Sequence, residues 1–217
     1  MSELFSIQLQ NRQQQGRDGV WLDLPTTTEQ VQAALRQIGI SSDNPQGLFI
    51  SGYFAEEEKR FAIPYNMVLA SNVDELNFLA SRLETLSTGE RAELNAALQA
   101  PQSELFSIGR ITDFPENVDY YVHLPDVHGP AQLGDYYLNR SGMVDMPEEW
   151  KGGIDTAQFG RYVAQQEQGV FTEYGYLVKR GDAWQKVHEG QPVPEEYRVL
   201  SFPAPEVLRD SANIPPP

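Results

Sequence analysis

The spacing of apolar residues changes twice along this chain, and this change limits the folds that it can adopt. Residues 3–10 and 20–24 alternate apolar and polar side chains, a pattern typical of strands with one buried face. A helix-like run, TTTEQVQAALRQIGI, follows, in which Thr26 and Glu29 have the spacing of a capping box. A third strand is predicted over residues 47–54, so the chain begins with a strand–strand–helix–strand unit.

In the middle of the chain, from residue 73 to residue 98, apolar residues fall at helical intervals. The turn-forming run Ser87-Thr88-Gly89 interrupts them, so two helices are expected. Ser71 or Asn72 is suited to cap the first helix, and Ser87 or Thr88 the second. We predict an ordinary antiparallel helical hairpin with a tight connection.

The third section mixes strand and helix patterns again. Residues 119–124 alternate like a strand, whereas 133–138 and 154–165 have helical spacing. Residues 171–178 are predicted to form a single strand with Gly175 inside it. These elements indicate a second α/β domain.

From residue 183 onward, prolines favour an extended, weakly ordered end, to which Trp184 and later apolar residues add one or two strands. The predicted fold class is α+β. Its predicted segments are an N-terminal α/β domain (1–70), a helical domain (71–103), an acidic α/β domain (104–182) and a Pro-rich extension (183–217).

Composition restricts the possible functions. The chain has 217 residues, a net charge of −15 and no cysteine. The charge favours basic partners and disfavours nucleic acid and acidic membrane surfaces, whereas the missing cysteines exclude disulfides and thiolate chemistry. The N-terminus lacks the features of a secretory signal, and no apolar run is long enough to span a bilayer. A soluble, cytoplasmic protein is expected.

The sequence offers no catalytic or cofactor signature. His123 and His128, with Asp126 between them, have some character of metal ligands, but nothing elsewhere completes a known metal-binding pattern. No phosphate-binding loop, dinucleotide fingerprint or nucleophile elbow follows any predicted strand. We therefore predict that the protein is not an enzyme and has no metal or cofactor.

The most informative stretch is residues 133–162, which combines aromatic residues, glycines and acids. Acids outnumber bases from Asp113 to Phe159, where Arg140 and Lys151 are the only basic residues. The acids of this region are Asp113, Glu116, Asp119, Asp126, Asp135, Asp145, Glu148, Glu149 and Asp155.

Several segments, taken in order over roughly residues 4 to 182, resemble the ArdA-type antirestriction proteins of conjugative plasmids and transposons. The residues that carry this resemblance are Gly19-Val20-Trp21-Leu22-Asp23-Leu24-Pro25, Val73-Asp74-Glu75-Leu76-Asn77-Phe78-Leu79-Ala80, Leu133-Gly134-Asp135-Tyr136-Tyr137, Ile154-Asp155 with Phe159-Gly160-Arg161, and Gly169-Val170-Phe171-Thr172 with Gly175-Tyr176.

The resemblance implies an elongated homodimer with a three-part fold. It also implies that acidic side chains imitate the phosphates of bent DNA and occupy the DNA-binding groove of type I restriction–modification enzymes, which protects incoming mobile DNA in the bacterial host. Such a mimic requires acids on one face rather than catalytic residues. Besides the nine acids above, the expected phosphate mimics are Asp74, Glu75, Glu84, Glu90 and Glu93.

Two questions stay open at the level of sequence. An acidic interaction or regulatory protein of a mobile element, binding some other basic protein, is the alternative function. For the dimer, strand 119–124 can bury Tyr121 and offer Tyr120 and Val122 to a partner, or pack both faces within one chain.

Overall fold

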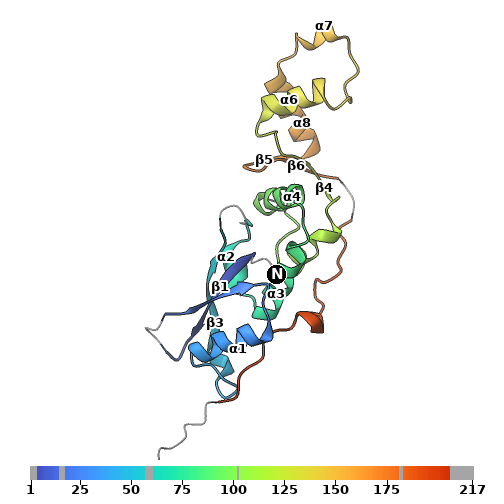
Figure 1. Ribbon diagram of the computed structural model, residues 1–217. Coiled ribbons are helices and arrows are strands. Elements are labelled where there is room, and N and C mark those ends of the chain that lie inside the picture. The colour runs from blue at the N-terminus through green and yellow to red at the C-terminus, as the bar shows by residue number, and fades with distance from the viewer. Residues whose placement is uncertain (1–3, 15–17, 57–60, 102, 181–182, 206–217) are drawn as a thin grey trace, which may run out of the picture.

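The computed structural model describes residues 4–14, 18–56, 61–101, 103–180 and 183–205 and shows an elongated α+β arrangement (Figure 1). Within these ranges, the strands form two three-stranded antiparallel sheets, in the orders β2-β1-β3 and β4-β6-β5. The elements are β1 (Phe5–Asn11), β2 (Val20–Leu24), α1 (Thr28–Gln37), η1 (Pro45–Gly47), β3 (Leu48–Phe54), α2 (Tyr65–Leu69), α3 (Val73–Leu83), α4 (Thr88–Gln99), α5 (Ile108–Thr112), η3 (Phe114–Glu116), β4 (Tyr121–Leu124), α6 (Pro130–Asn139), α7 (Glu148–Lys151), α8 (Thr156–Glu167), β5 (Val170–Thr172), β6 (Gly175–Lys179) and η4 (Glu195–Tyr197).

The predicted strand–strand–helix–strand start is confirmed, with one difference at the helix cap. Thr27, rather than Thr26, caps α1, and Gln30 rather than Glu29 completes the capping box. The shift has a tertiary cause, because Thr26 is buried and its backbone N–H donates to Asn77 Oδ1 on α3 at 2.7 Å.

The two middle helices have the predicted caps but not the predicted packing. Asn72 caps α3 and Ser87 caps α4, each with a complete capping box. However, α3 packs mainly on α5 and β2, whereas α4 packs on β4 and β6. Figure 1 shows α4 along its axis and α3 lying across it, so the predicted antiparallel hairpin is wrong. Helical periodicity identifies a buried face but does not say which element covers it.

Residues 170–179 form a hairpin, not the predicted single strand. β5 and β6 pair antiparallel, with Phe171 opposite Tyr176 and Thr172 opposite Gly175. Gly175 has a φ of +120°, a conformation that side chains with a Cβ rarely adopt, and it begins the second strand directly after the turn. β6 also pairs with β4, which lies at the outer edge of this sheet.

Helices α6 and α8 touch through their backbones. A Cβ atom added to Gly134 on α6 would lie 1.9 Å from the carbonyl oxygen of Thr156, and one on Gly160 of α8 would lie 1.8 Å from that of Pro130. Neither position has room for a side chain, so both glycines are needed for this close crossing. The Leu-Gly-Asp and Phe-Gly-Arg segments of the sequence therefore have a packing role.

Residues 183–205, called the strap below, return along the molecule from the second sheet to α1 (Figure 1). The backbone N–H of Ser42 donates to Pro203 O at 2.9 Å, and Gln32 Nε2 donates to Ser201 Oγ at 3.2 Å. The strap contains the 3-10 turn η4 and no strand, so the predicted strands and weak order are wrong for these residues. Residues 206–217 lie outside the described part of the chain.

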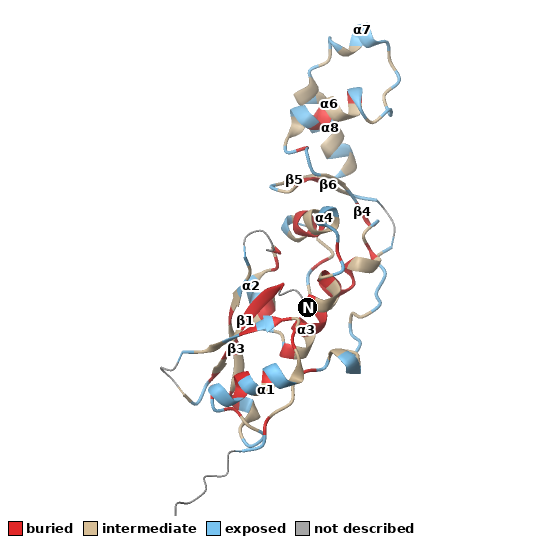
Figure 2. Ribbon diagram, viewed as in Figure 1, coloured by how far each residue is buried: buried red, intermediate tan, exposed pale blue. Residues whose placement is uncertain are grey.

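Buried residues are concentrated in one part of the molecule, as Figure 2 shows. The first sheet, α1–α5 and the strap, together called the base, share a continuous core that extends to Val199. Helices α6–α8 and the connection over residues 140–155, called the tip, contribute to a much smaller cluster built on Val127, Leu133 and Tyr176. The sheet β4-β6-β5 joins base and tip. The four-segment division of the sequence stays a prediction.

No helix in the described ranges has both the length and the apolar character needed to cross a membrane.

Candidate functional site: the acidic surface

The acids predicted to act together fall into two groups, because several of them hold the base in place. Asp113 is completely buried. Its Oδ1 accepts the backbone N–H of His188 at 2.6 Å, and its Oδ2 accepts that of Glu189 at 3.2 Å. A buried carboxylate with two N–H donors is satisfied by the fold and is not available to a partner. The prediction that Asp113 lies on the binding surface is therefore wrong.

Asp74 has a similar structural role at the other end of the strap. Its Oδ1 accepts the backbone N–H groups of Val199 and Leu200, both at 2.7 Å. Nearby, Asn77 Nδ2 donates to Tyr197 O at 3.0 Å. Asp74 therefore fixes the strap to helix α3, and its half-buried carboxylate already accepts hydrogen bonds from the strap.

Three further acids of the base are used in local contacts. Glu116 forms an ion pair with Arg82, which offsets its charge. Glu75 and Glu90 complete the capping boxes of α3 and α4, and hydrogen bonds from Ser87 lower the pKa of Glu90. Glu84 is half-buried at the C-terminal cap of α3. These acids contribute to the field of the base, but in positions set by helix ends and ion pairs.

Glu93 carries little charge near neutral pH. Burial, with repulsion from Asp119 and Glu90 as smaller causes, raises its pKa to about 8. Its Oε1 atom is buried without a hydrogen-bond partner among the described residues. A carboxyl group that is mostly protonated at pH 7 is a poor substitute for a phosphate.

The second group of acids is exposed and lies mostly at the tip. Asp145, Glu148 and Glu149 lie in or beside α7, and Asp155 caps α8 by accepting the N–H of Gln158 at 2.9 Å. Asp119 and Asp126 are exposed on either side of β4. Repulsion between these carboxylates is only weakly opposed, so this surface has a negative potential.

Two cations of the tip are paired with acids. Arg140 Nη2 lies 2.8 Å from Asp135 Oδ2, and hydrogen bonds from Asn139 and Arg140 lower the pKa of Asp135. Lys151 Nζ lies 2.9 Å from Glu148 Oε2. In the described ranges, Asp126, Asp145, Glu149 and Asp155 form no ion pair.

The framework that presents these acids is held by a shared carboxylate. Glu167 on α8 accepts hydrogen bonds from the hydroxyls of Tyr137 on α6 and Tyr176 on β6, the latter at 2.9 Å. Burial, followed by these bonds, raises the pKa of both tyrosines, which therefore stay protonated as donors. Together with the two glycines of the α6–α8 crossing, Glu167 fixes the orientation of the helices.

Sequence reasoning missed the large apolar side chains at the same end. Met143 is 74% exposed, Trp150 68% and Tyr162 60%. Residues 154–165 have the helical spacing of a buried face, yet the described residue that is buried on α8 is Gly160, and Tyr162 points to solvent. Exposed aromatic residues among acids indicate a surface that binds protein.

The two proposed dimer residues have different environments. Tyr121 is buried, as expected, but Tyr120 is only 6% exposed, with its ring centroid 5.1 Å from that of Trp184 on the strap. The expectation that Tyr120 faces a partner is wrong, because the strap covers it. Val122 is exposed on β4, at the edge of the sheet.

The histidines beside Asp126 have ordinary roles. His123 Nε2 lies 2.8 Å from Tyr174 O, and His128 is exposed. One group in the described chain has the spacing of metal ligands, formed by Asp113, Glu116 and His188. Asp113 already binds the backbone of the strap, and Glu116 already pairs with Arg82. These contacts explain why the three side chains lie close together.

The chain was compared with curated proteins and with models of protein families. No match was found among the curated proteins. The family model described as antirestriction protein (ArdA) matches residues 15–178, which is well over half of the chain and excludes the strap. The chain therefore belongs to the ArdA antirestriction protein family.

Proposed function

We propose that this protein is an antirestriction protein that acts without catalysis, as an acidic mimic of DNA that occupies the DNA-binding groove of a type I restriction–modification enzyme. The observation that carries the proposal is the surface of the tip, where exposed acids outnumber cations around a helix pair, α6 and α8, that is fixed by backbone contact. A basic DNA-binding groove attracts such a surface by the same electrostatics that attracts phosphates. The protein would thereby protect incoming mobile DNA in the cytoplasm of its bacterial host.

The physical requirement for mimicry is rigidity. Carboxylates on a mobile segment would lose conformational freedom on binding, whereas Asp135 on α6 and Asp155 at the start of α8 are placed by Gly134, Gly160 and Glu167. The acids that support the proposal are the half-exposed Asp135 and the exposed Asp119, Asp126, Asp145, Glu148, Glu149 and Asp155. The acids that bind the strap are not part of this proposed surface.

We further propose that the protein is a homodimer. β4 is a short edge strand that pairs with β6 on one side and carries the exposed Val122, so the backbone groups on its other side are available for pairing with a second copy. Light scattering at micromolar concentration tests this proposal. A Val122→Lys protein that remains dimeric would place the contact elsewhere, and a monomeric parent protein would contradict the dimer itself.

The test of mimicry is competition with DNA for a purified type I methyltransferase core. Unlabelled protein is expected to displace a fluorescent duplex carrying the recognition site, and to do so less well as salt rises. Absence of binding at low salt, where surface electrostatics is strongest, would exclude the mimic.

A variant with a charge-neutralised tip tests whether binding depends on the acids of the tip or only on the net charge of the protein. The variant Asp145→Asn, Glu148→Gln, Glu149→Gln and Asp155→Asn keeps an N-cap acceptor at Asp155, and it should compete much less well. The matched control makes the same change in charge at exposed acids of the base, namely Asp18→Asn, Asp43→Asn, Glu195→Gln and Glu196→Gln. Equal loss in both variants would show that only net charge matters.

The exposed Met143 and Trp150 favour one alternative, an acidic interaction protein that binds another basic protein through an apolar anchor. Replacing both residues with serine distinguishes the two. A DNA mimic should compete nearly as well after this change, whereas an anchored interaction protein should lose most of its affinity.

A further inference from the structure

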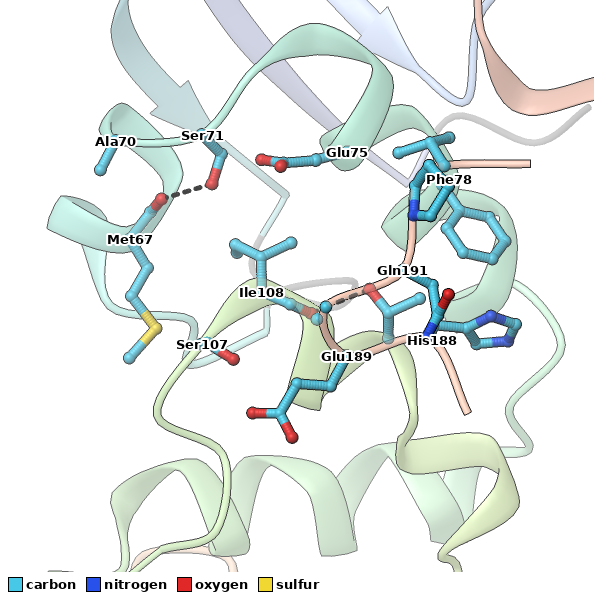
Figure 3. Close-up of a pocket in the computed structure, with 15 residues that line it drawn as sticks. Met67, Ala70, Ser71, Glu75, Phe78, Ser107, Ile108, His188, Glu189 and Gln191 are labelled. Atoms are coloured by element: carbon cyan, nitrogen blue, oxygen red, sulfur yellow. Dashed lines mark hydrogen bonds between the residues drawn. The ribbon is translucent and has the colours of Figure 1, made fainter. Parts of the chain in front are cut away.

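A cavity of about 580 Å³ lies in the base, far from the tip acids, between α2, α3, α5 and the strap. Its volume is typical of sites that bind small molecules. Figure 3 shows its lining, with Ile108 pointing into the centre, Met67 at one side and Phe78 at the other. The strap closes it with residues 188–193.

The closing segment is held in position by contacts already described. Asp113 binds the backbone of His188 and Glu189, and the ring of His188 packs against that of Phe78 with centroids 4.9 Å apart. The strap also crosses α5 closely, because a Cβ on Gly109 would lie 3.2 Å from Glu189 Cα. The cavity is therefore formed before any ligand arrives, which lowers the cost of binding.

The polar groups of the lining determine which ligand it suits. Glu189 is neutralised by Arg110, whose Nε lies 3.0 Å from its Oε1, and by Lys186. Glu75 also lines the cavity, and Figure 3 shows its carboxylate reaching along the wall towards Ser71. Among the described residues, the lining contains no lysine or arginine. Glu75, the acid of this lining without an ion pair in the described part of the chain, lies in a largely apolar, half-open cavity, which favours a ligand with one positive charge and an apolar body.

We propose that this cavity is a binding site for a small organic cation, such as an aliphatic amine, whose ammonium group meets Glu75 and whose hydrocarbon chain packs between Met67, Phe78 and Ile108. The site is independent of the DNA mimicry proposed above. It combines the helices of the family-matched region with the strap, which lies outside that match.

Methionine methyl groups provide the measurement. In protein labelled with ¹³C at the methionine methyls, hexylammonium should shift the Met67 signal saturably, whereas Met143 at the tip should not respond. Met67→Leu assigns the signal. Hexanol and hexanoate are matched probes of equal chain length, and they should bind more weakly than the amine. No saturable shift with hexylammonium at millimolar concentration, or equal binding of hexanoate, would overturn the proposal.

Two variants test the residues. Glu75→Gln keeps a side-chain acceptor for the capping box of α3, so the fold should persist while affinity for hexylammonium falls about tenfold with the lost charge. Its control is Glu90→Gln, which makes the same change at the equivalent capping position of α4, outside the cavity. Ala70→Leu should reduce binding of all three probes by filling space. Unchanged amine affinity in Glu75→Gln would refute the assigned charge contact.

Discussion

The base and the tip use the same residue type for opposite purposes. In the base, Asp74 and Asp113 accept backbone N–H groups of the strap and are structural. At the tip, Asp145, Glu149 and Asp155 are exposed and form no ion pair within the described residues. The base has a continuous core, whereas the tip depends on one helix crossing and one shared carboxylate. Acid content alone therefore does not identify a binding surface.

The largest expected effect is at Asp113. Replacement by alanine leaves the N–H groups of His188 and Glu189 without their acceptor and should lower the free energy of unfolding by about 3 kcal/mol. Urea denaturation measures this, with Asp126→Ala as the exposed control. If the two variants were equally stable, the distinction between structural and surface acids would fail.

The next effect should be confined to the tip. Gly160→Ala places a methyl group against Pro130 O and should destabilise the α6–α8 pair by on the order of 2 kcal/mol. Hydrogen exchange should then speed up in α6 and α8 while the first sheet stays protected. Gly152→Ala is the control, because a Cβ there meets no atom within 4 Å. Equal loss of protection in the base would show that base and tip unfold as one unit.

A smaller effect is expected at Glu93, where substitution should raise the free energy of unfolding instead of lowering it. Its pKa is raised from 4.5 to about 8 in the folded state. Between these pH values the unfolded chain releases the proton and the folded chain keeps it, so stability falls as pH rises. Glu93→Gln should therefore match the parent below pH 4.5 and be more stable by about 1–2 kcal/mol at pH 8, allowing for solvent screening. Thermal unfolding across this pH range measures the difference, and a pH-independent one would contradict the assignment.

The smallest effect on stability should come from the exposed acids. Glu148 has a side chain that is 81% exposed, and its ion pair with Lys151 is at the surface. Neutralising Asp145, Glu148 and Glu149 together should change the free energy of unfolding by less than about 0.5 kcal/mol. The same protein should bind its basic partner more weakly. A large loss of stability would mean that these acids, too, are structural.

Much of the local structure could be predicted from residues close together in sequence. The sequence narrows the first cap to Ser71 or Asn72 and the second to Ser87 or Thr88, and in the structure Asn72 and Ser87, each with a glutamate three residues later, form the caps. The first three strands lie close to the residues predicted for them. The helical hairpin was wrong because periodicity does not name a packing partner, and residues 171–178 were read as one strand because the turn before Gly175 has only two residues.

The sequence by itself determined the net charge, most of the helices and strands, and the family, because each depends on composition or on neighbouring residues. Only the tertiary structure decided which acids are available. Asp113 is buried by contacts with His188 and Glu189, which lie 75 and 76 positions further along the chain. Tyr120 is covered by Trp184. The strap was expected to be weakly ordered because its prolines cannot donate hydrogen bonds; it is held by acceptors on distant helices that no local pattern reveals.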